Sequence, residues 1–205
     1  MKRVILVPVI HNAADLGSLA DSVRGHYLRR FGPSVWKERE RALERLWGDI
    51  RRAIAAMRLD YGKVRIYQDG LPVCGREEQI SRELAGAGSL NHQLVLELVR
   101  QGAALMGTED PQLLIREYQL QRRRLGDTAG NAGAGHLPGA GHLPGERQSP
   151  GEAEDLLAAR DRFITQRIDE TLRDGETGIL FLGAAHRIDA IRSSGADVVT
   201  LDCAG

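Results

Sequence analysis

The stretch Lys2-Arg-Val-Ile-Leu-Val-Pro-Val-Ile10 decides the fold class of this chain. Its apolar residues follow one another without the alternation of a strand that has one solvated face. Such a run predicts a strand buried on both faces, as in a parallel sheet covered by helices. Further along the chain, shorter β-rich runs predict four more strands, at Lys63–Tyr67, Ala103–Met106, Gly178–Leu182 and Ala196–Leu201.

Helical patterns separate these runs. Within Ser34–Leu59, apolar residues recur every three or four positions, which predicts a helix with Ser34 as its N-cap and an end at Gly62. Asp110-Pro111 is typical of an N-cap followed by proline at the first helical position, and another helix is expected from about Glu152 to Arg173. Strands that alternate with helices predict an α/β fold, a mainly parallel sheet covered on both sides.

Composition indicates a single globular domain over residues 1–205, with one interruption. Residues 126–151 hold 8 of the 24 glycines and 3 of the 7 prolines, and include two consecutive copies of Ala-Gly-His-Leu-Pro-Gly. Because this segment has little apolar surface to offset the entropy of ordering, we expect a flexible insertion. His136 and His142 of the repeat are weak metal-ligand candidates, since no predicted strand or helix holds them.

The charge balance and the cysteine content exclude several classes of protein. Twenty-eight basic and 28 acidic residues give zero net charge, whereas nucleic-acid binders usually carry a basic surplus. Two cysteines are too few for a disulfide framework or a cysteine-rich zinc site. The apolar run near the start is too short to span a bilayer or to serve as a signal peptide. We therefore expect a cytoplasmic protein that binds neither nucleic acid nor membrane.

Polar residues follow each predicted strand, and in a parallel sheet these positions meet at the carboxyl-end edge. His11 follows the first strand, Asp69 the second, Glu109 the third and His186 the fourth. Histidine and carboxylate side chains suit a divalent transition metal, and a His–carboxylate pair without metal can act as a general base. Each residue also has a purely structural interpretation: a turn at Asp69, helix-dipole pairing at Glu109 and packing at the histidines.

Arg160 lies on the apolar face of the helix predicted after the insertion, four residues from both Leu156 and Ile164. An inward guanidinium keeps its charge and needs an acidic or carbonyl partner, for which Glu109 or Asp69 would serve. The alternative is that the side chain extends outward along its apolar stem.

Several of these segments together resemble the TraB/GumN/Tiki superfamily. The helix beginning at Arg160, the strand ending in Gly183-Ala-Ala-His186 and the terminal Gly195-Ala-Asp-Val-Val are similar to the C-terminal part of that family. Gly107-Thr-Glu-Asp110 resembles the segment in which the family places a glutamate. Val7-Pro-Val-Ile-His11 occupies the place of the family's first Gly-x-x-His motif, with Pro8 instead of the glycine.

The resemblance implies an α/β fold and, for some members, divalent-metal-dependent proteolysis. By carry-over it makes His11, His186 and Glu109 candidate metal ligands, with Glu109 also a candidate base. It makes Arg160 an anchoring or oxyanion-stabilising cation, and Asp69 the candidate for the acidic residue after the second strand.

Two hypotheses of different classes follow. The first is a metal-dependent hydrolase that binds manganese, cobalt or zinc and cleaves a peptide or ester bond of a peptide or small molecule. The second is a non-catalytic binding or regulatory protein on the same fold. A haem or small-ligand carrier that uses the same histidines is a third alternative. The sequence does not indicate an oligomeric state.

Overall fold

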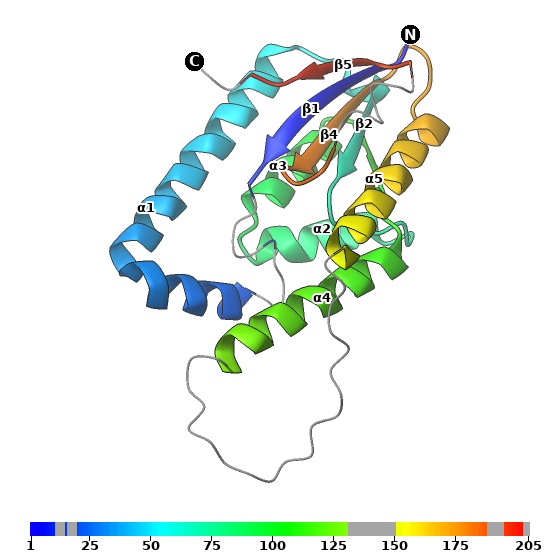
Figure 1. The fold of residues 1–205 in the computed structure, drawn as a ribbon. Coiled ribbons are helices and arrows are strands. Elements are labelled where there is room, and N and C mark those ends of the chain that lie inside the picture. Colours follow the sequence, from blue (N-terminus) through cyan, green and yellow to red (C-terminus); the bar gives the residue numbers. More distant parts are fainter. Residues whose placement is uncertain (11–14, 16–19, 131–150, 188–194, 203–205) are drawn as a thin grey trace.

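The computed structural model describes residues 1–10, 15, 20–130, 151–187 and 195–202 (Figure 1). Five parallel strands form one sheet in the order β3-β2-β4-β1-β5. Their bounds are β1 Arg3–Val9, β2 Val64–Gln68, β3 Ala104–Met106, β4 Thr177–Gly183 and β5 Asp197–Thr200. The predicted α/β class and all five predicted strands are therefore confirmed.

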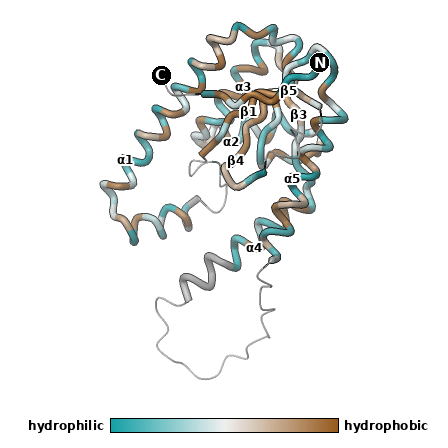
Figure 2. Tube along the Cα trace, turned by 45° about the horizontal axis from the view of Figure 1, so that its top comes forward, coloured by the Kyte–Doolittle hydropathy of each residue, from teal (hydrophilic) through white to brown (hydrophobic). Residues whose placement is uncertain are grey.

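Strand β1 lies between β4 and β5 and is buried on both sides, as its uninterrupted apolar run predicts. Ile5, Val7 and Val9 belong to one hydrophobic core, whereas Val4 and Leu6 belong to another on the opposite face. This division follows from the alternation of successive side chains along a strand. The tube coloured by hydropathy shows the hydrophobic strands gathered in the interior, with mixed colours along the surrounding helices (Figure 2).

Helices cover both faces of the sheet. They are α1 Ala20–Ala56, α2 Glu77–Gly86, α3 Leu90–Arg100, α4 Pro111–Gly130 and α5 Glu152–Thr171, with a short 3-10 helix η2 at Tyr61–Lys63. Residues of α1 and α3 pack in the first core, including Ile50 and Leu94, and α5 supplies Ile164 and Ile168 to the second. The predicted helix after the insertion is thus confirmed, with its end at Thr171.

Helix α1 begins earlier than its periodicity predicts and bends at Gly32. Gly32 has φ +81°, a left-handed conformation that glycine adopts readily, and Pro33 follows it. Proline lacks an amide hydrogen but fits the first turn of the helical segment that resumes there. The prediction that Ser34 is the N-cap is wrong, because Ser34 lies inside this segment and Gly32 marks the break.

The end of α1 also differs from the prediction. The helix ends at Ala56 and not at Gly62, because Arg58 takes a left-handed φ of +48°. Gly62 instead lies within η2. By contrast, the predicted cap at Asp110 is confirmed: Asp110 Oδ1 accepts hydrogen bonds from the backbone N–H groups at positions 112 and 113, at 2.7 and 3.3 Å.

The predicted insertion overlaps α4. Residues 126–130 continue that helix, so the expected boundary at Gly126 is too early. Gly151 is the N-cap residue of α5. His136 and His142 lie outside the described residues. No helix of the described part of the chain is both long enough and apolar enough to cross a membrane.

Candidate functional site

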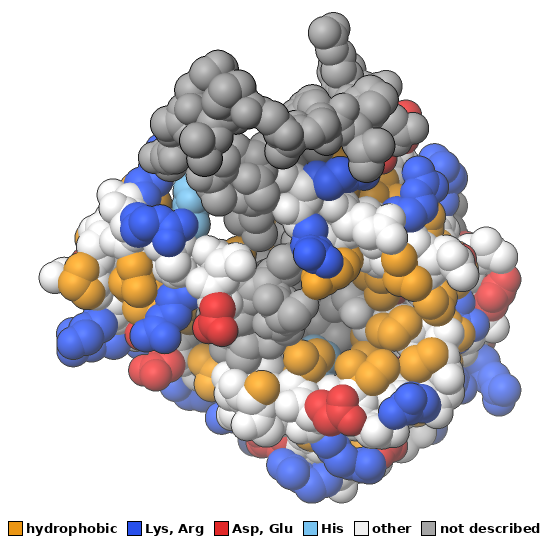
Figure 3. All heavy atoms as spheres, turned by 90° about the horizontal axis from the view of Figure 1, so that it is seen from below, with side chains coloured by type: hydrophobic (Ala, Val, Ile, Leu, Met, Phe, Trp, Pro, Cys, Tyr) orange, Lys and Arg blue, Asp and Glu red, His pale blue; other side chains and the backbone are white. Residues whose placement is uncertain are grey.

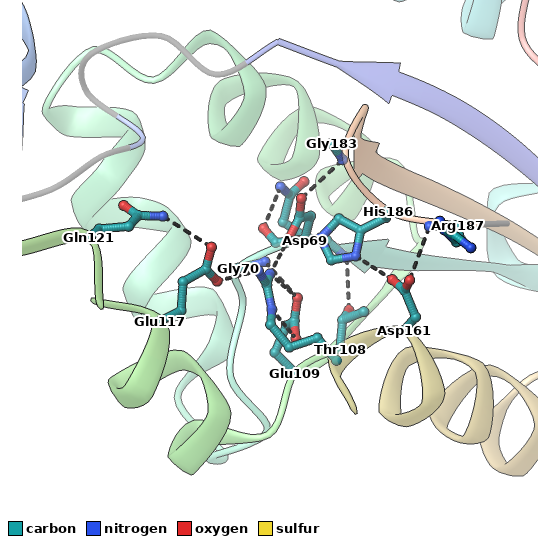
Figure 4. Close-up of polar contacts among 12 residues, drawn as sticks. Asp69, Gly70, Thr108, Glu109, Glu117, Gln121, Asp161, Gly183, His186 and Arg187 are labelled. Carbon is teal, nitrogen blue, oxygen red and sulfur yellow. Dashed lines mark hydrogen bonds and ion pairs between the residues drawn. The ribbon is translucent and has the colours of Figure 1, made fainter. Parts of the chain in front are cut away.

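The carboxyl ends of three neighbouring strands bring Asp69, Glu109 and His186 together. Asp69 follows β2, Glu109 follows β3 and His186 follows β4, and these strands are adjacent in the order β3-β2-β4. One potential ligand atom from each side chain lies within 4.8 Å of the other two. The expected convergence of these three residues is therefore found, and Figure 4 shows their side chains directed toward one another.

Arg160 of α5 joins this group as predicted, and its guanidinium points inward. Nη2 donates to Asp69 Oδ1 at 2.7 Å and to Glu109 Oε1 at 2.5 Å, and Nε donates to Glu109 Oε2 at 3.1 Å. Nη1 donates to Glu117 of α4. Only 5 % of Arg160 is exposed, so the alternative in which the side chain extends outward is wrong.

His186 lies between two carboxylates. Its Nδ1 is 2.6 Å from Asp161 Oδ1 and its Nε2 is 3.3 Å from Asp69 Oδ1. The ring is held by its own turn, in which the His186 amide donates to the carbonyl of Gly183. Because an ionised carboxylate only accepts hydrogen bonds, this environment favours the doubly protonated imidazolium.

These six side chains form what we call the charged cluster: Asp69, Glu109, Glu117, Arg160, Asp161 and His186. Four of its members are acids, one is a permanent cation and one is a histidine. Burial of such groups is costly unless they are paired, and here each of them has a charged partner. Clusters of this kind concentrate at functional sites, although structural ion-pair networks occur as well.

Glu109 owes its position to backbone pairing between two loops. The amides of Thr108 and Glu109 both donate to the carbonyl of Leu71, and the Val73 amide donates to the carbonyl of Glu109. This pairing requires close approach at Gly107, where an added Cβ would lie 2.7 Å from the Cα of Val73. A larger residue at position 107 would therefore push the loop that carries Glu109 out of place.

Contacts with β4 and its following turn, together with Arg160, position Asp69. Its amide donates to the carbonyl of Phe181 at 2.9 Å, which continues the pairing of β2 with β4. The amide of Gly183 donates to Asp69 Oδ2 at 3.0 Å. Both oxygens of Asp69 are thus bound, one by backbone and the other by Arg160 and His186, so its orientation is determined by three separate elements.

The environment shifts the pKa of three members of the charged cluster. Burial raises the pKa of Glu109, against the lowering effect of Arg160. Burial alone would lower the pKa of Arg160, but hydrogen bonds and charge from Glu109 and Asp69 outweigh it and raise that pKa. The pKa of His186 is also raised, because Asp69 and Asp161 outweigh the effect of burial.

A cavity of about 350 Å³ opens beside the charged cluster. Asp69, Glu117, Arg160 and His186 line it, together with apolar side chains of α2, α4 and α5. In Figure 3 the molecule is seen from below, the side toward which the strand arrows of Figure 1 point, and hydrophobic side chains gather there among charged ones. A cavity of this size can hold a small ligand.

The donor set of Asp69, Glu109 and His186 has the chemistry of a transition-metal site, with two carboxylate oxygens and one imidazole nitrogen. In the structure Arg160 Nη2 bonds to one oxygen of each of the two carboxylates, Asp69 Oδ1 and Glu109 Oε1. A divalent ion would therefore have to displace this guanidinium from Asp69 and Glu109. Glu117, which already accepts a hydrogen bond from Nη1, could keep Arg160 paired when that happens. The residues fit a metal, but only with Arg160 moved.

Not every predicted site residue can be placed. His11, expected as a metal ligand, lies outside the described residues. The sequence analysis missed Glu117 and Asp161. Glu117 shares a helical face with Leu114 and Gln121, which also line the cavity, so the periodicity of α4 could have revealed it. Asp161 follows Arg160 directly, and no sequence signal distinguishes it from a surface acid.

Comparisons of the chain with protein-family models, with curated proteins and with solved structures find no match.

Proposed function

We propose that this protein is a hydrolase that cleaves an ester or peptide bond of a small substrate in the cavity beside the charged cluster. The observation that carries the proposal is the buried junction of Asp69, Glu109, Arg160 and His186 at the carboxyl-end edge of a parallel sheet. Ligands bind at this edge in open α/β sheets. Paired acids and a histidine supply the proton transfers that hydrolysis requires.

Each residue has a role that its contacts support. Asp69, which lines the cavity, accepts a proton from the attacking water as the new carbon–oxygen bond forms. Arg160 stabilises the negative charge that develops on the carbonyl oxygen through its own positive charge, while its hydrogen bonds to the protein's carboxylates are kept. His186, held as a donor between two acids, gives a proton to the leaving oxygen or nitrogen as the scissile bond breaks. Glu109 is completely buried and holds Arg160 in position through both of its carboxylate oxygens.

A divalent metal is the proposed cofactor, with manganese, cobalt or zinc as the candidates and Asp69, Glu109 and His186 as its described ligands. Because a ligating histidine must be neutral, His186 would give up its extra proton to bind the ion, and the ion would then supply the activation in place of the proton transfers above. A bound ion would lower the pKa of water and polarise the carbonyl. The expectation that His11 is a ligand together with His186 and Glu109 is part of the same proposal. The contact of Arg160 with Glu117 supports the metal proposal, because Glu117 can stay paired with Arg160 when Asp69 and Glu109 bind the metal ion.

The decisive experiment measures hydrolysis of matched p-nitrophenyl esters and anilides, with and without added Mn²⁺, Co²⁺ or Zn²⁺. Asp69→Asn and Glu109→Gln are expected to lower kcat/KM about 100-fold or more. The control Glu78→Gln changes an exposed acid of α2 and should leave the rate unchanged. Equal rates for all variants would refute the proposal, as would a wild-type rate equal to the uncatalysed one.

Metal binding is measured separately, by competition with a chromogenic chelator. We expect micromolar affinity in the wild type and a loss of about ten-fold or more in His186→Gln. If hydrolysis depends on Asp69 but no metal binds, the cofactor proposal fails while the hydrolase proposal stands.

A second candidate function is a non-catalytic binding protein. The observation that favours it is the complete pairing of Asp69 and Glu109 by Arg160, Gly183 and Gly70. Acids held in this way can act as a rigid recognition surface without transferring protons. Ligand binding without turnover in the assays above would support this candidate.

Membership of the TraB/GumN/Tiki superfamily and a cytoplasmic location are part of the proposal. The order of the strand-end residues Asp69, Glu109 and His186, with Arg160 on the helix before the last of them, supports the family. Cys74 is a free thiol on the surface, which is compatible with a reducing compartment.

A further inference from the structure

We infer that the cavity recognises a cationic ligand: a primary amine or a related nitrogen donor joined to a short apolar group. The inference rests on the proposed function only in treating this cavity as the substrate site. It deepens that proposal by naming the substrate class. The evidence comes from an unpaired acceptor, from the balance of charge around the cavity and from its apolar wall.

The unpaired acceptor is the side-chain oxygen of Gln68, a residue that lines the cavity and is completely buried. Its Nε2 donates to the carbonyl of Asp69 at 3.0 Å. This hydrogen bond fixes which end of the side-chain amide is the nitrogen and which is the acceptor oxygen Oε1. Among the described residues, Oε1 has no hydrogen-bond partner. A buried acceptor without a partner is costly, and a ligand that donates a hydrogen bond would satisfy it.

The charges around the cavity favour the same kind of ligand. Asp15, Asp69 and Glu117 line it, against Arg160 and His186. With His186 counted as an imidazolium and His92 as neutral, the acids are in excess by one. His92 also lines the cavity, where its Nδ1 lies 3.2 Å from the hydroxyl of Ser81.

An anionic ligand has little to bind here. Arg160 already directs Nε, Nη1 and Nη2 at carboxylates of the protein. The Gly183 amide is likewise taken by Asp69. An anion would face the surplus acids and compete with them for donors, whereas an ammonium group would find carboxylate oxygens and the free Oε1 of Gln68.

The remaining wall explains the apolar part of the ligand. Leu84, Leu114 and Leu157 line the cavity from α2, α4 and α5, and Tyr118 adds an aromatic ring. The volume of about 350 Å³ lies at the lower end of the range for small-molecule sites. A short alkyl or aryl amine therefore matches both the size and the chemistry.

The test uses three ligands of equal chain length: hexylamine, hexan-1-ol and hexanoate. Their affinities for the full chain are measured at neutral pH by isothermal titration calorimetry or by protein-observed NMR. We expect hexylamine, present as its cation, to bind about ten-fold more tightly than hexanol, and hexanoate to bind most weakly. Equal or tighter binding of hexanoate would overturn the inference.

Two variants locate the binding. Gln68→Met removes the free acceptor at similar length, and Glu117→Gln removes one negative charge from a partly exposed position. Each should weaken hexylamine binding about ten-fold without altering hexanol binding. Glu170→Gln, which changes an exposed acid on α5, is the matched control and should change neither. Unaltered hexylamine affinity in both cavity variants would refute the inference, and should either variant fail to fold, the wild-type ligand series decides alone.

Failure of this inference is distinguishable from failure of the proposed function. Hydrolysis that depends on Asp69, without preference for hexylamine over hexanol, would overturn the inference alone. Preference for hexylamine without hydrolysis of any ester or anilide would overturn the proposed function alone.

Discussion

Arg160 forms a bidentate ion pair with Glu109, in which Nε lies 3.1 Å from Oε2 and Nη2 lies 2.5 Å from Oε1. This bidentate pair connects α5 to the loop after β3 across 51 residues of sequence, and Glu109 is completely buried. The geometry combines two parallel hydrogen bonds with opposite charge, the arrangement for which arginine is better suited than lysine.

Substitution of Arg160 tests how much this pair contributes to stability. Arg160→Met leaves Asp69 and Glu109 buried without their cation, and we expect the free energy of unfolding to fall by about 3–5 kcal/mol. The measurement is urea denaturation at neutral pH. Arg162→Met, which replaces an exposed arginine two residues further along α5, should change stability by less than about 0.5 kcal/mol. Equal losses in the two variants would contradict the role given to Arg160.

Gly107 tests the close approach that positions Glu109. In Gly107→Ala the new Cβ would lie 2.7 Å from Val73 Cα and 2.9 Å from the carbonyl oxygen of Pro72, both backbone atoms. We expect a loss of about 1–3 kcal/mol in thermal or chemical unfolding.

The matched control for Gly107→Ala is Gly86→Ala at the end of α2, where an added Cβ meets nothing within 4 Å. Alanine there should be neutral or stabilising, because it favours the helix. A stability of Gly107→Ala equal to that of Gly86→Ala would show that the loop accommodates the methyl group.

Asp161 tests the electrostatic environment of His186. In Asp161→Asn the carboxylate beside Nδ1 becomes neutral, so the imidazolium loses one of the two acids that stabilise it, and the pKa of His186 should fall. An NMR titration of the imidazole signals follows this change, with His186→Gln used to assign the resonance. The control Asp169→Asn alters an exposed acid of α5 and should leave the titration unchanged. An unmoved or raised pKa in Asp161→Asn would refute the assigned contact.

The Arg65–Glu176 pair predicts how stability depends on pH. Arg65 Nε and Nη2 donate to the two oxygens of Glu176 at 2.5 and 2.8 Å, and these hydrogen bonds lower the pKa of Glu176 from 4.5 to about 2. Because the folded pKa is depressed, the contribution of the pair is fully present above about pH 4.5 and is lost as the pH falls toward 2.

Glu176→Gln measures that contribution. The wild type should exceed the variant in stability by about 1–2 kcal/mol at pH 7, and the difference should shrink between pH 4.5 and 2. Urea denaturation across this range is the measurement. Asp174→Asn, a substitution of a neighbouring and much more exposed acid, is the control. A difference that does not change with pH would contradict the assigned pairing.

Much of the site could be predicted because strand ends are local signals. Asp69, Glu109 and His186 each follow an apolar run in the sequence, and Arg160 interrupts an apolar helical face. Glu117 is indicated only by the helical face that it shares with Leu114 and Gln121, and Asp161 carries no signal, since acids on a helix usually face solvent. Their roles depend on where α4 and α5 pack. His11 lies outside the described residues, so its role as a metal ligand stays a prediction from the sequence.

By itself the sequence determined the α/β class and the positions of the strands, because apolar runs and helical periodicity are properties of neighbouring residues. It did not determine where α1 begins, since the apolar pattern starts after the bend at Gly32 while the helix extends back to Ala20. Only the tertiary structure decided the order β3-β2-β4-β1-β5. It also decided which acids surround Arg160. Both depend on contacts between segments far apart in the chain, for which a single sequence has no local pattern.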